Sequence, residues 1–412
     1  MVSYVLTCLI MWLSLLKSDI HMSRRTFLVN AVFFFSFFES YFIFTYYLIA
    51  NIVPTIDDRL PIQAAFHLVI VVALFLSGRL IHRFNELRVI YACAIVNVVL
   101  SIFLVVPIDF FRIGVLFVME VVGSIGILAA VTYFWRLTGN QERGRIAGLI
   151  GFFVIPSYFI VNIVVAPGLD FLGTILLSII VSILPLACIL LKPSQIRSSK
   201  NRDGHSVYYE KRVTVLYLIP WIVFSIINFT LAKNESNIIQ AQVLPSFYLT
   251  LLASQLIGVI FGVSIGGVMS DLLGRRLPLV FSLTLYGFSS ALLGLFTNDV
   301  LVLIVYVANG LSWGFLFVLY IFVIWGDLAN KNNYTRVYSL GLMTYYLSLG
   351  IGLLVQIDIP IFQSALLSCL LVFLLNIPVV LAPELLPTHI LDRLRMKVHM
   401  GAVKKLQRDN QG

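Results

Sequence analysis

An all-α fold of membrane-spanning helices is predicted by three observations on this chain of 412 residues. Hydrophobic residues make up 60% of it and charged residues only 11%, whereas soluble globular chains average about 45–50% and about 25%. Apolar runs of about 20 residues recur, which is the length that a helix needs to cross about 30 Å of hydrocarbon. These runs exceed the roughly 10 residues of a barrel strand, so helices are expected to satisfy the backbone hydrogen bonds in lipid.

Twelve apolar runs are long enough to span the bilayer. They cover residues 26–50, 60–81, 89–108, 111–135, 146–167, 171–191, 213–231, 243–269, 277–296, 300–326, 337–357 and 361–381. We expect a polytopic protein of twelve transmembrane helices in two pseudo-symmetric six-helix bundles, over residues 26–192 and 213–382. The polar, basic stretch 193–212 is typical of a flexible cytoplasmic linker, and residues 383–412 form a polar cytoplasmic tail.

The N-terminal segment, residues 1–25, is not counted among these spans. Its apolar run is short for a span, and it lacks the basic start of a secretory signal. It is either an extra helix or the result of a mis-assigned start, with translation beginning at Met22.

No cofactor or metal is expected from the sequence. The cysteines lie singly in apolar segments, without C-x-x-C spacing or clustered histidines, and are interpreted as packing residues. They are Cys8, Cys93, Cys188 and Cys369. No stretch reads G-x-x-x-x-G-K-[ST], so nothing is expected to hold nucleotide phosphates, and any work must draw on a gradient or a partner.

Lysine and arginine set the predicted orientation, because they stay preferentially in cytoplasmic loops. If residues 17–25 are cytoplasmic, only Arg59, Arg112 and Lys233 fall outside. We therefore expect a monomeric, multi-pass protein of the cell (plasma) membrane with the ends of both bundles in the cytoplasm. The same bias explains the net charge of +9 without nucleic acid as a partner, which leaves the lipid bilayer, a small-molecule substrate and protons.

An internal repeat relates the two predicted bundles. SGRLIHRFNELR, residues 77–88, follows the second span as GGVMSDLLGRR, residues 266–276, follows the eighth, at an offset of about 189. Trp135 and Asn140 match Trp325 and Asn330 at an offset of 190. Pro193 and Pro383 likewise follow the sixth and the twelfth span. A common offset at three places predicts two homologous halves.

Two loops and the tail resemble a known family. The pattern Gly267-x-x-x-Asp271-x-x-Gly274-Arg275-Arg276 resembles the loop signature of the major facilitator superfamily, and Gln141-Glu142-Arg143-Gly144-Arg145 is similar to its loop between spans four and five. The tail Pro383-Glu384-Leu385-Leu386-Pro387 is similar to the sequence after the last span of its sugar porter branch. The first-half copy departs from the pattern, with His82 for Asp and Asn85 for Gly, and Arg136 lies where sugar porters carry Glu.

This resemblance implies a cytoplasmic gate that latches the two halves together when the protein opens outward. The implied gate residues are Gly267, Asp271, Gly274, Arg275, Arg276, Gly78, His82, Arg83, Arg88, Glu142, Arg143, Arg145, Asp327 and Arg336. At the level of the residues, Asp271 is expected to accept from arginines or from the free N–H groups of a neighbouring helix. The alternative is that the arginines are ordinary membrane anchors and Asp271 is a helix cap.

Three glycines precede this gate motif at intervals of four residues. Gly258, Gly262 and Gly266 predict a face for close helix packing. The G-x-S-x-G match at residues 262–266 is not interpreted as a hydrolase elbow, because that motif needs a strand, a turn and a helix.

Two acids lie well inside the predicted spans, Glu39 and Glu120. An ionised carboxylate at the bilayer centre costs about 2.5–3.5 kcal/mol on insertion scales. Counted by the rise of an α-helix from the cytoplasmic ends of their spans, the two acids should lie at one level, and the resemblance places both on the central pathway. They are candidates for proton coupling or solute binding, the alternative being permanently protonated groups hydrogen-bonded to Ser40, Thr45 or the backbone. For His67 we expect a packing or hydrogen-bonding role.

Other polar and aromatic residues at mid-depth are candidates for a solute site between the halves. They are Asn162, Trp221, Asn228, Asn309, Trp313 and Tyr345, with Tyr346 beside them.

The function that the sequence favours is secondary active transport by alternating access, with proton-coupled uptake of a small organic solute. The tail resemblance suggests a sugar-like solute. An alternative is proton-driven export of cationic or drug-like compounds, because the acids have no basic partner. A transport-dead membrane sensor is a second alternative. No enzymatic activity is expected, because the spans lack a set of nucleophile, base or metal ligands at one depth.

Overall fold

The computed structural model describes residues 22–53, 55–161, 168–191, 211–242, 245–295, 299–355 and 361–386, together with residues 392 and 396. All regular structure in these ranges is helical, which confirms the predicted fold class. The segment 1–21, Asn162, most of the linker and most of the tail beyond residue 386 lie outside the described residues. The predictions made for them therefore stay predictions.

The first half contains six spans. The first of them joins α2 (Arg24–Phe42), a π-helical stretch η1 (Ile43–Leu48) and α3 (Ile49–Ile52). The others are α4 (Ile56–Phe84), α5 (Glu86–Phe103), α6 (Asp109–Leu137), α7 (Arg143–Phe159) and α8 (Phe171–Ala187), the last with a 3-10 turn, η4 (Cys188–Leu191).

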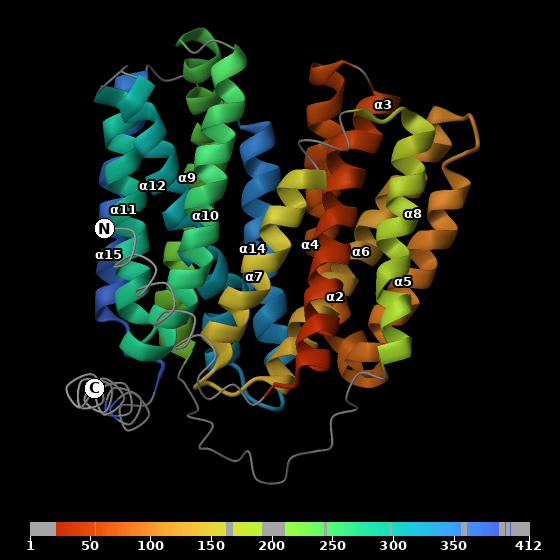
Figure 1. The fold of residues 1–412 in the computed structure, drawn as a ribbon, viewed down its shortest axis with the longest axis horizontal. Coiled ribbons are helices and arrows are strands. Elements are labelled where there is room, and N and C mark those ends of the chain that lie inside the picture. The colour runs from red at the N-terminus through yellow and green to blue at the C-terminus, as the bar shows by residue number, and fades with distance from the viewer. Residues whose placement is uncertain are drawn as a thin grey trace, which may run out of the picture.

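The second half repeats this plan. Its spans are α9 (Lys211–Gln242), α10 (Pro245–Leu273), α11 (Arg276–Leu295), the combination of α12 (Asp299–Phe317), η5 (Val318–Val323) and α13 (Ile324–Leu328), then α14 (Tyr334–Leu354) and α15 (Ile361–Leu381). Figure 1 shows this half in green to blue beside the first half in red to yellow.

The helices are those of an integral, multi-pass membrane protein. Among the described residues, nine helices are long and apolar enough to cross a bilayer, and α7, α11 and α15 complete the twelve. Most predicted spans agree closely with them, but α9 continues to Gln242 rather than ending at residue 231, and α5 ends at Phe103 rather than at residue 108. Pro107 explains the early end, because the residue before a proline is disfavoured in a helix.

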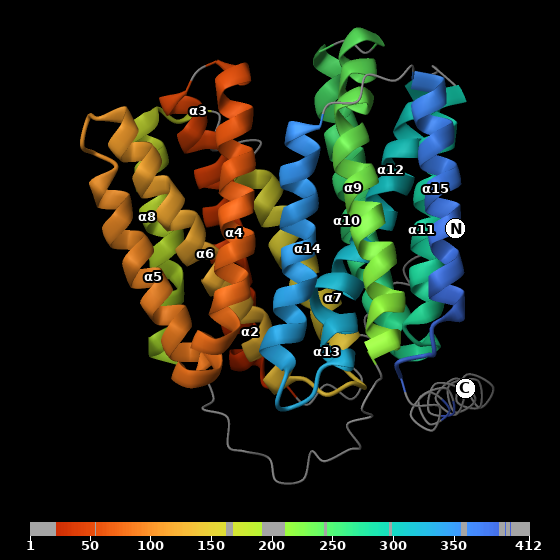
Figure 2. The same cartoon turned by 180° about the vertical axis from the view of Figure 1, so that it is seen from behind.

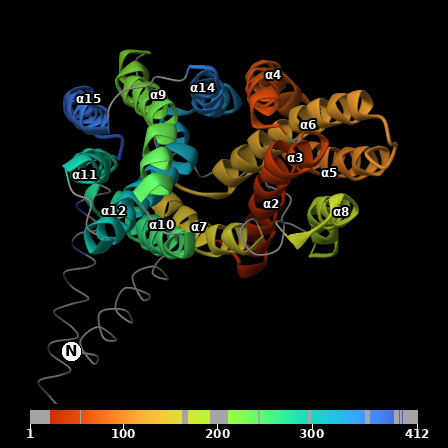
Figure 3. The ribbon, with the colours of Figure 1, turned by 90° about the horizontal axis from the view of Figure 1, so that it is seen from above.

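The two halves pack against each other along two seams. Helix α4 lies beside α14, and α7 lies beside α10 (Figures 2 and 3). We use "linker end" for the end of the bundles that holds Leu191 and Lys211, between which the linker runs.

Glycines bring α10 close to its neighbours. A Cβ added at Gly258 or Gly262 would lie closer than 3.0 Å to backbone of α12, so the predicted packing face is confirmed. Gly267 on the same helix faces α7, where an added Cβ would lie closer than 3.0 Å to the carbonyl oxygen of Gly144. The end of α10 can therefore approach α7 only because neither residue has a side chain.

The turns at the two motif copies share one backbone feature. Asn85, between α4 and α5, has a φ of 72°, and Gly274, between α10 and α11, has a φ of 95°. These are the described positions with positive φ, and their separation along the chain equals the offset of the repeat. Asparagine tolerates this conformation better than most residues, so the departure from Gly in the first half keeps the turn.

Candidate functional site

Asp271, near the end of α10, binds the start of α7 in the other half. Its carboxylate accepts from the backbone N–H groups of Gly144 at 3.0 Å and Arg145 at 2.9 Å, and from the Arg145 Nε at 3.2 Å. The side chain is completely buried. A carboxylate at a helix N-terminus neutralises the positive end of the helix dipole. Both partners expected for Asp271, an arginine and free helix N–H groups, are thus present at once.

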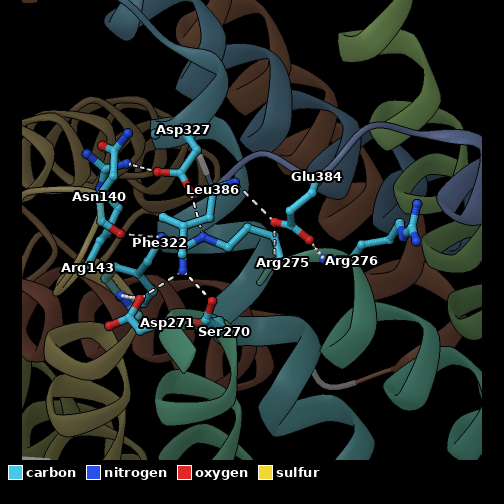
Figure 4. A network of polar contacts seen from close by, with 12 residues as sticks. Asn140, Arg143, Ser270, Asp271, Arg275, Arg276, Phe322, Asp327, Glu384 and Leu386 are labelled. Carbon is cyan, nitrogen blue, oxygen red and sulfur yellow. Dashed lines mark hydrogen bonds and ion pairs between the residues drawn. The ribbon is translucent and has the colours of Figure 1, made fainter. Parts of the chain in front are cut away.

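Arg275 joins this carboxylate to a second one. Its Nη1 donates to the Asp271 Oδ1 at 2.8 Å, and its Nε donates to the Asp327 Oδ2 at 2.6 Å. Its Nη2 donates to the Asn140 carbonyl of the first half at 2.6 Å, and Arg143 from that half also pairs with Asp327 (Figure 4). We call Asp271, Arg275, Asp327, Arg143 and Arg145 the latch.

Arg275 keeps its positive charge because two carboxylates lie beside it. Burial alone lowers the pKa of a guanidinium, because it penalises the charged form. The carboxylates of Asp327 and Asp271 more than offset this, so the pKa of Arg275 lies above its ordinary value. The latch therefore carries two buried anions and three arginines whose side chains are almost completely buried. Such an arrangement is costly to break by removing one member.

The chain after α15 supports the turn from which Arg275 starts. The Glu384 carboxylate accepts from the backbone N–H groups of Arg275 at 2.7 Å and Arg276 at 3.1 Å (Figure 4). A Cβ at Gly274 would lie closer than 3.0 Å to this carboxylate. Tyr217 on α9 donates to the Pro383 carbonyl at 2.9 Å, which ties the same segment to the second half.

The remaining residues of the predicted gate lie around the latch in different ways. Glu142 is buried and accepts from the Gly139 N–H at 3.4 Å. Gly78 is buried against Thr335 at the α4–α14 seam. The exposed ones are His82, Arg83, Arg88, Arg276 and Arg336. Of these, the Arg276 guanidinium reaches the carbonyls at the end of α15, and the structure does not bring the other four into the latch.

The first half has its own ion pair where its motif copy ends. Glu86, at the start of α5, is buried and accepts from the Arg136 Nη1 at 2.6 Å. The hydroxyl of Tyr334, the first residue of α14, donates to the other Glu86 oxygen at 2.8 Å, so this contact also crosses between the halves. The Tyr334 ring stacks on Trp135 at 4.6 Å, and Trp135 donates to the Gly326 carbonyl at 2.8 Å.

Glu120 lies deeper, between α2 and α4. Its Oε1 accepts from the Thr45 hydroxyl at 2.5 Å, and Gln63 of α4 donates to the Thr45 carbonyl at 2.7 Å. Thr45 belongs to the π-helical stretch η1, a type of irregularity that is frequent at functional sites. The carboxylate also interacts electrostatically with Tyr41 of α2 and Tyr346 of α14. Glu120 therefore faces the interface of the two halves.

Glu39 does not face the interface of the two halves as Glu120 does. Ser36, one turn before it, donates to the Val181 carbonyl of α8, so Glu39 lies on a face turned toward the inside of the first bundle. Tyr41 is two residues further, about 200° around the helix, and faces α14. Phe37 packs on Gly126, which places Glu39 roughly one helical turn closer to the linker end than Glu120. The structure therefore differs from the expected arrangement of two acids at one level on one pathway.

Aromatic rings pack on one another in the second half. Trp221 stacks on Tyr320 at 4.4 Å and on Tyr345 at 5.8 Å, while its Nε1 donates to the Gly341 carbonyl at 2.9 Å. Phe229 lies between Tyr345 and Trp313. Of the predicted solute-site residues, Trp313 and Tyr345 are only half-buried.

The two predicted asparagines are engaged within the second bundle. Asn228 accepts from the Tyr286 hydroxyl at 2.7 Å, and Asn309 accepts from the Gln255 amide at 3.3 Å. Rings from both halves meet nearby, because Phe38 contacts Phe317 at 5.8 Å. The aromatic residues thus reach the interface, whereas these amides contact helices of their own half.

Sequence reasoning did not single out Glu86, Tyr334 or Glu384 as site residues. Glu86 could have been found from the repeat, because it precedes Arg275 by the common offset. Glu384 was quoted for the tail resemblance, but its backbone partners lie far away along the chain and no local pattern indicates them. Tyr334 carries no motif signal at all.

The fold and the latch define a class of protein: two six-helix membrane bundles held together at one end by buried ion pairs. Solved structures of major facilitator superfamily transporters have this fold. The E. coli fucose:proton symporter gives a TM-score of 0.66 at 12% identity, over 87% of this chain and 98% of that one. The proton:xylose symporter XylE gives 0.67 at 11% identity, over 87% and 96%. The human organic anion transporter MFSD10 gives 0.65 at 10% identity, over 88% and 99%.

No family model and no curated protein matches the sequence. The likeness is therefore one of fold.

Proposed function

We propose that this chain is a secondary active transporter that moves a small organic solute by alternating access. The observation that carries the proposal is the latch, a set of ion pairs and helix-cap bonds that joins the halves at the linker end. A network of this kind has two states, formed or broken, and alternating access needs such an element. The positive-inside bias of the sequence supports a cytoplasmic linker end in the cell membrane, and we propose a monomer.

Proton coupling is the energy source that we propose, with Glu120 as the proton-binding group. Its carboxyl is buried at the interface and has one hydroxyl donor, Thr45. A proton carried through the membrane field would supply about 2.3 kcal/mol per 100 mV. Glu39 remains a proposed second acid for proton coupling. It lies on a different face of α2 from Tyr41, the residue that faces α14.

The solute that we favour is neutral and sugar-like, taken up with the proton. Two of the solved structures with this fold are proton symporters of fucose and xylose, which supports this assignment. Export of cationic compounds is the second candidate. The half-buried rings of Trp313 and Tyr345 in the second half and the Glu120 carboxylate in the first suit a cation, because aromatic faces and carboxylates both attract positive charge.

The test is reconstitution into liposomes with an imposed pH gradient, with a panel of neutral and cationic solutes and a reporter of internal pH. We expect Glu120→Gln to abolish solute-dependent proton movement while exchange of solute between the two sides persists. Glu39→Gln, which changes a buried acid of the same half, is the matched comparison. Solute-driven proton flux that is unchanged in Glu120→Gln would contradict the coupling proposal. A solute that accumulates only outside the liposomes would favour export.

A further inference from the structure

His67 lies near the middle of α4, at the seam with α14. It is completely buried, and neither ring nitrogen has a hydrogen-bond partner. A neutral imidazole always carries one N–H donor and one acceptor, so both are left unsatisfied here. The sequence left a packing or a hydrogen-bonding role open, and in this state the imidazole packs without a hydrogen bond. Buried polar groups without partners are rare in folded proteins and call for an explanation.

Both halves of the molecule enclose this ring. Tyr41 of α2 lies at 6.0 Å and Tyr346 of α14 at 6.3 Å between ring centroids. A Cβ at Gly350 would lie 3.3 Å from the His67 Cβ, so the α14 backbone is directly against it. Separation of α4 and α14 would therefore open one side of the imidazole to water.

The groups around His67 are phenols and one carboxyl. Glu120 of α6 interacts with Tyr41 and Tyr346, the two tyrosines that contact the imidazole. Phe66 packs on Phe117 at 4.4 Å, which places His67 and Glu120 within about 3 Å of each other in depth. The predicted spans contain no Lys or Arg at this depth. Glu120 and His67, rather than Glu120 and Glu39, thus lie at one level of the interface.

We propose that His67 is a proton-binding site of the transport cycle, which takes a proton from water when the α4–α14 seam opens and returns it when the seam closes. The proposal rests on the alternating-access function above. In the closed seam an imidazolium would be buried between two rings with no acceptor for either N–H. In the open seam water can satisfy both N–H groups. Because linkage is reciprocal, protonation of His67 must in turn favour the open seam.

The test measures the seam directly and needs no solute. Spin labels at Arg83→Cys and Asn332→Cys, both exposed positions at the linker end, report the separation of α4 from the loop before α14. The background carries Ala at the four natural cysteines and Glu120→Gln, so that this carboxyl cannot titrate. Distance distributions are recorded in lipid nanodiscs between about pH 8 and about pH 5.5, the range in which histidine titrates.

We expect the open population to rise as the pH falls, with the ratio of open to closed changing by at most about tenfold per pH unit for one proton. Adding His67→Gln should remove most of this pH dependence, whereas adding Asp109→Asn, which changes an exposed acid of the same half, should leave it. A full pH dependence in the His67→Gln variant would overturn the proposal, and so would a parent whose distances do not respond to pH.

A second variant keeps the test decisive if His67→Gln folds poorly. His67→Phe fills the same space with an apolar ring and removes the unsatisfied nitrogens, so it should fold and hold the seam closed at acidic pH. A seam that still opens on acidification in this variant contradicts the proposal. If the liposome assay fails while the His67-dependent opening persists, the proposed transport function is wrong, and only the coupling between His67 protonation and the α4–α14 seam stands.

Discussion

The α7–α10 seam and the α4–α14 seam close the same end of the molecule by different chemistry. At α7–α10, Asp271 accepts from backbone and guanidinium groups of the other half, with every side chain nearly inaccessible to solvent. At α4–α14, His82 holds the equivalent position but is exposed. The hydrogen bonds between the halves there are neutral or single, such as the Ser339 hydroxyl on the Leu74 carbonyl and, beside the seam, the Tyr334 hydroxyl on Glu86 of α5. Two copies of one motif have therefore diverged into a strong and a weak closure.

Each motif copy also takes part in an ion pair with the end of a later span of its own half, but the acid and the base have changed places between the two halves. In the second half the motif supplies Arg275 and the end of the tenth span supplies Asp327. In the first half the motif supplies Glu86 and the end of the fourth span supplies Arg136. Glu86 and Arg275 are related by the repeat offset, whereas Arg136 lies one residue after Trp135 and Asp327 lies two residues after its counterpart Trp325. What the position requires is a pair of opposite charges, and either order satisfies it.

Among the substitutions that compare the two seams, Asp271→Asn is expected to destabilise the closed state most. The change leaves the Arg275 and Arg145 guanidiniums buried with less compensating charge, and breaking a buried pair in this way costs about 3–5 kcal/mol. The cost falls on the closed state, so the open population at the linker end should rise at least about a hundredfold. Spin labels at Arg83→Cys and Asn332→Cys measure this open population.

Asp109→Asn is the control for that variant. Its carboxylate is 70% exposed and pairs with Arg112 on the same helix, where a surface pair contributes about 0–1 kcal/mol. An equal response of the two variants would show that the latch does not hold the closed state.

An intermediate effect is expected from adding one methyl group at the matched glycines. Gly267→Ala forces α10 away from the Gly144 carbonyl, and overpacking of this kind costs about 1–3 kcal/mol. At Gly78 the nearest atom to an added Cβ lies 3.8 Å away, so Gly78→Ala should be neutral or stabilising by up to about 1 kcal/mol. Thermal unfolding in detergent compares the two. Equal destabilisation would mean that the seams are equally tight.

The smallest effect is expected in a double-mutant cycle of Glu86→Gln and Arg136→Met. The Arg136 side chain is 35% exposed, so solvent screens the pair and we expect a coupling energy of at most about 1 kcal/mol in the free energy of unfolding. Glu86→Gln alone should cost somewhat more, because it also weakens the bond from Tyr334. A coupling as large as that between Asp271 and Arg275 would show that the two closures are equivalent.

The sequence predicted the fold well because its signals are local. Apolar runs and the repeat placed the spans, and the last one, residues 361–381, coincides with α15. The motif at residues 267–276 indicated an acid that binds a helix start, and Asp271 does so. A helix-packing face was likewise predicted from the spacing of three glycines.

Side-chain direction was the part that the sequence could not supply. Depth along a helix placed Glu39 and Glu120 together, but their faces depend on the register of α2 against α6 and α8. The π-helical stretch η1, which changes the helical phase around Thr45, has no signal in composition. For His67 the sequence suggested a packing or hydrogen-bonding role, and only the packed structure shows that no donor or acceptor reaches the ring.

The hydrogen bonds that Glu384 accepts from the turn at Arg275 have a consequence for biosynthesis. The two residues are separated by 109 positions, so every member of the ion-pair network is synthesised well before its support. A ribosome that stops after α15 would release a protein with all its spans and all its gate charges, yet with the arginine turn unbraced. The hydrogen bonds that hold the arginine turn can therefore form only after all the described spans have been synthesised.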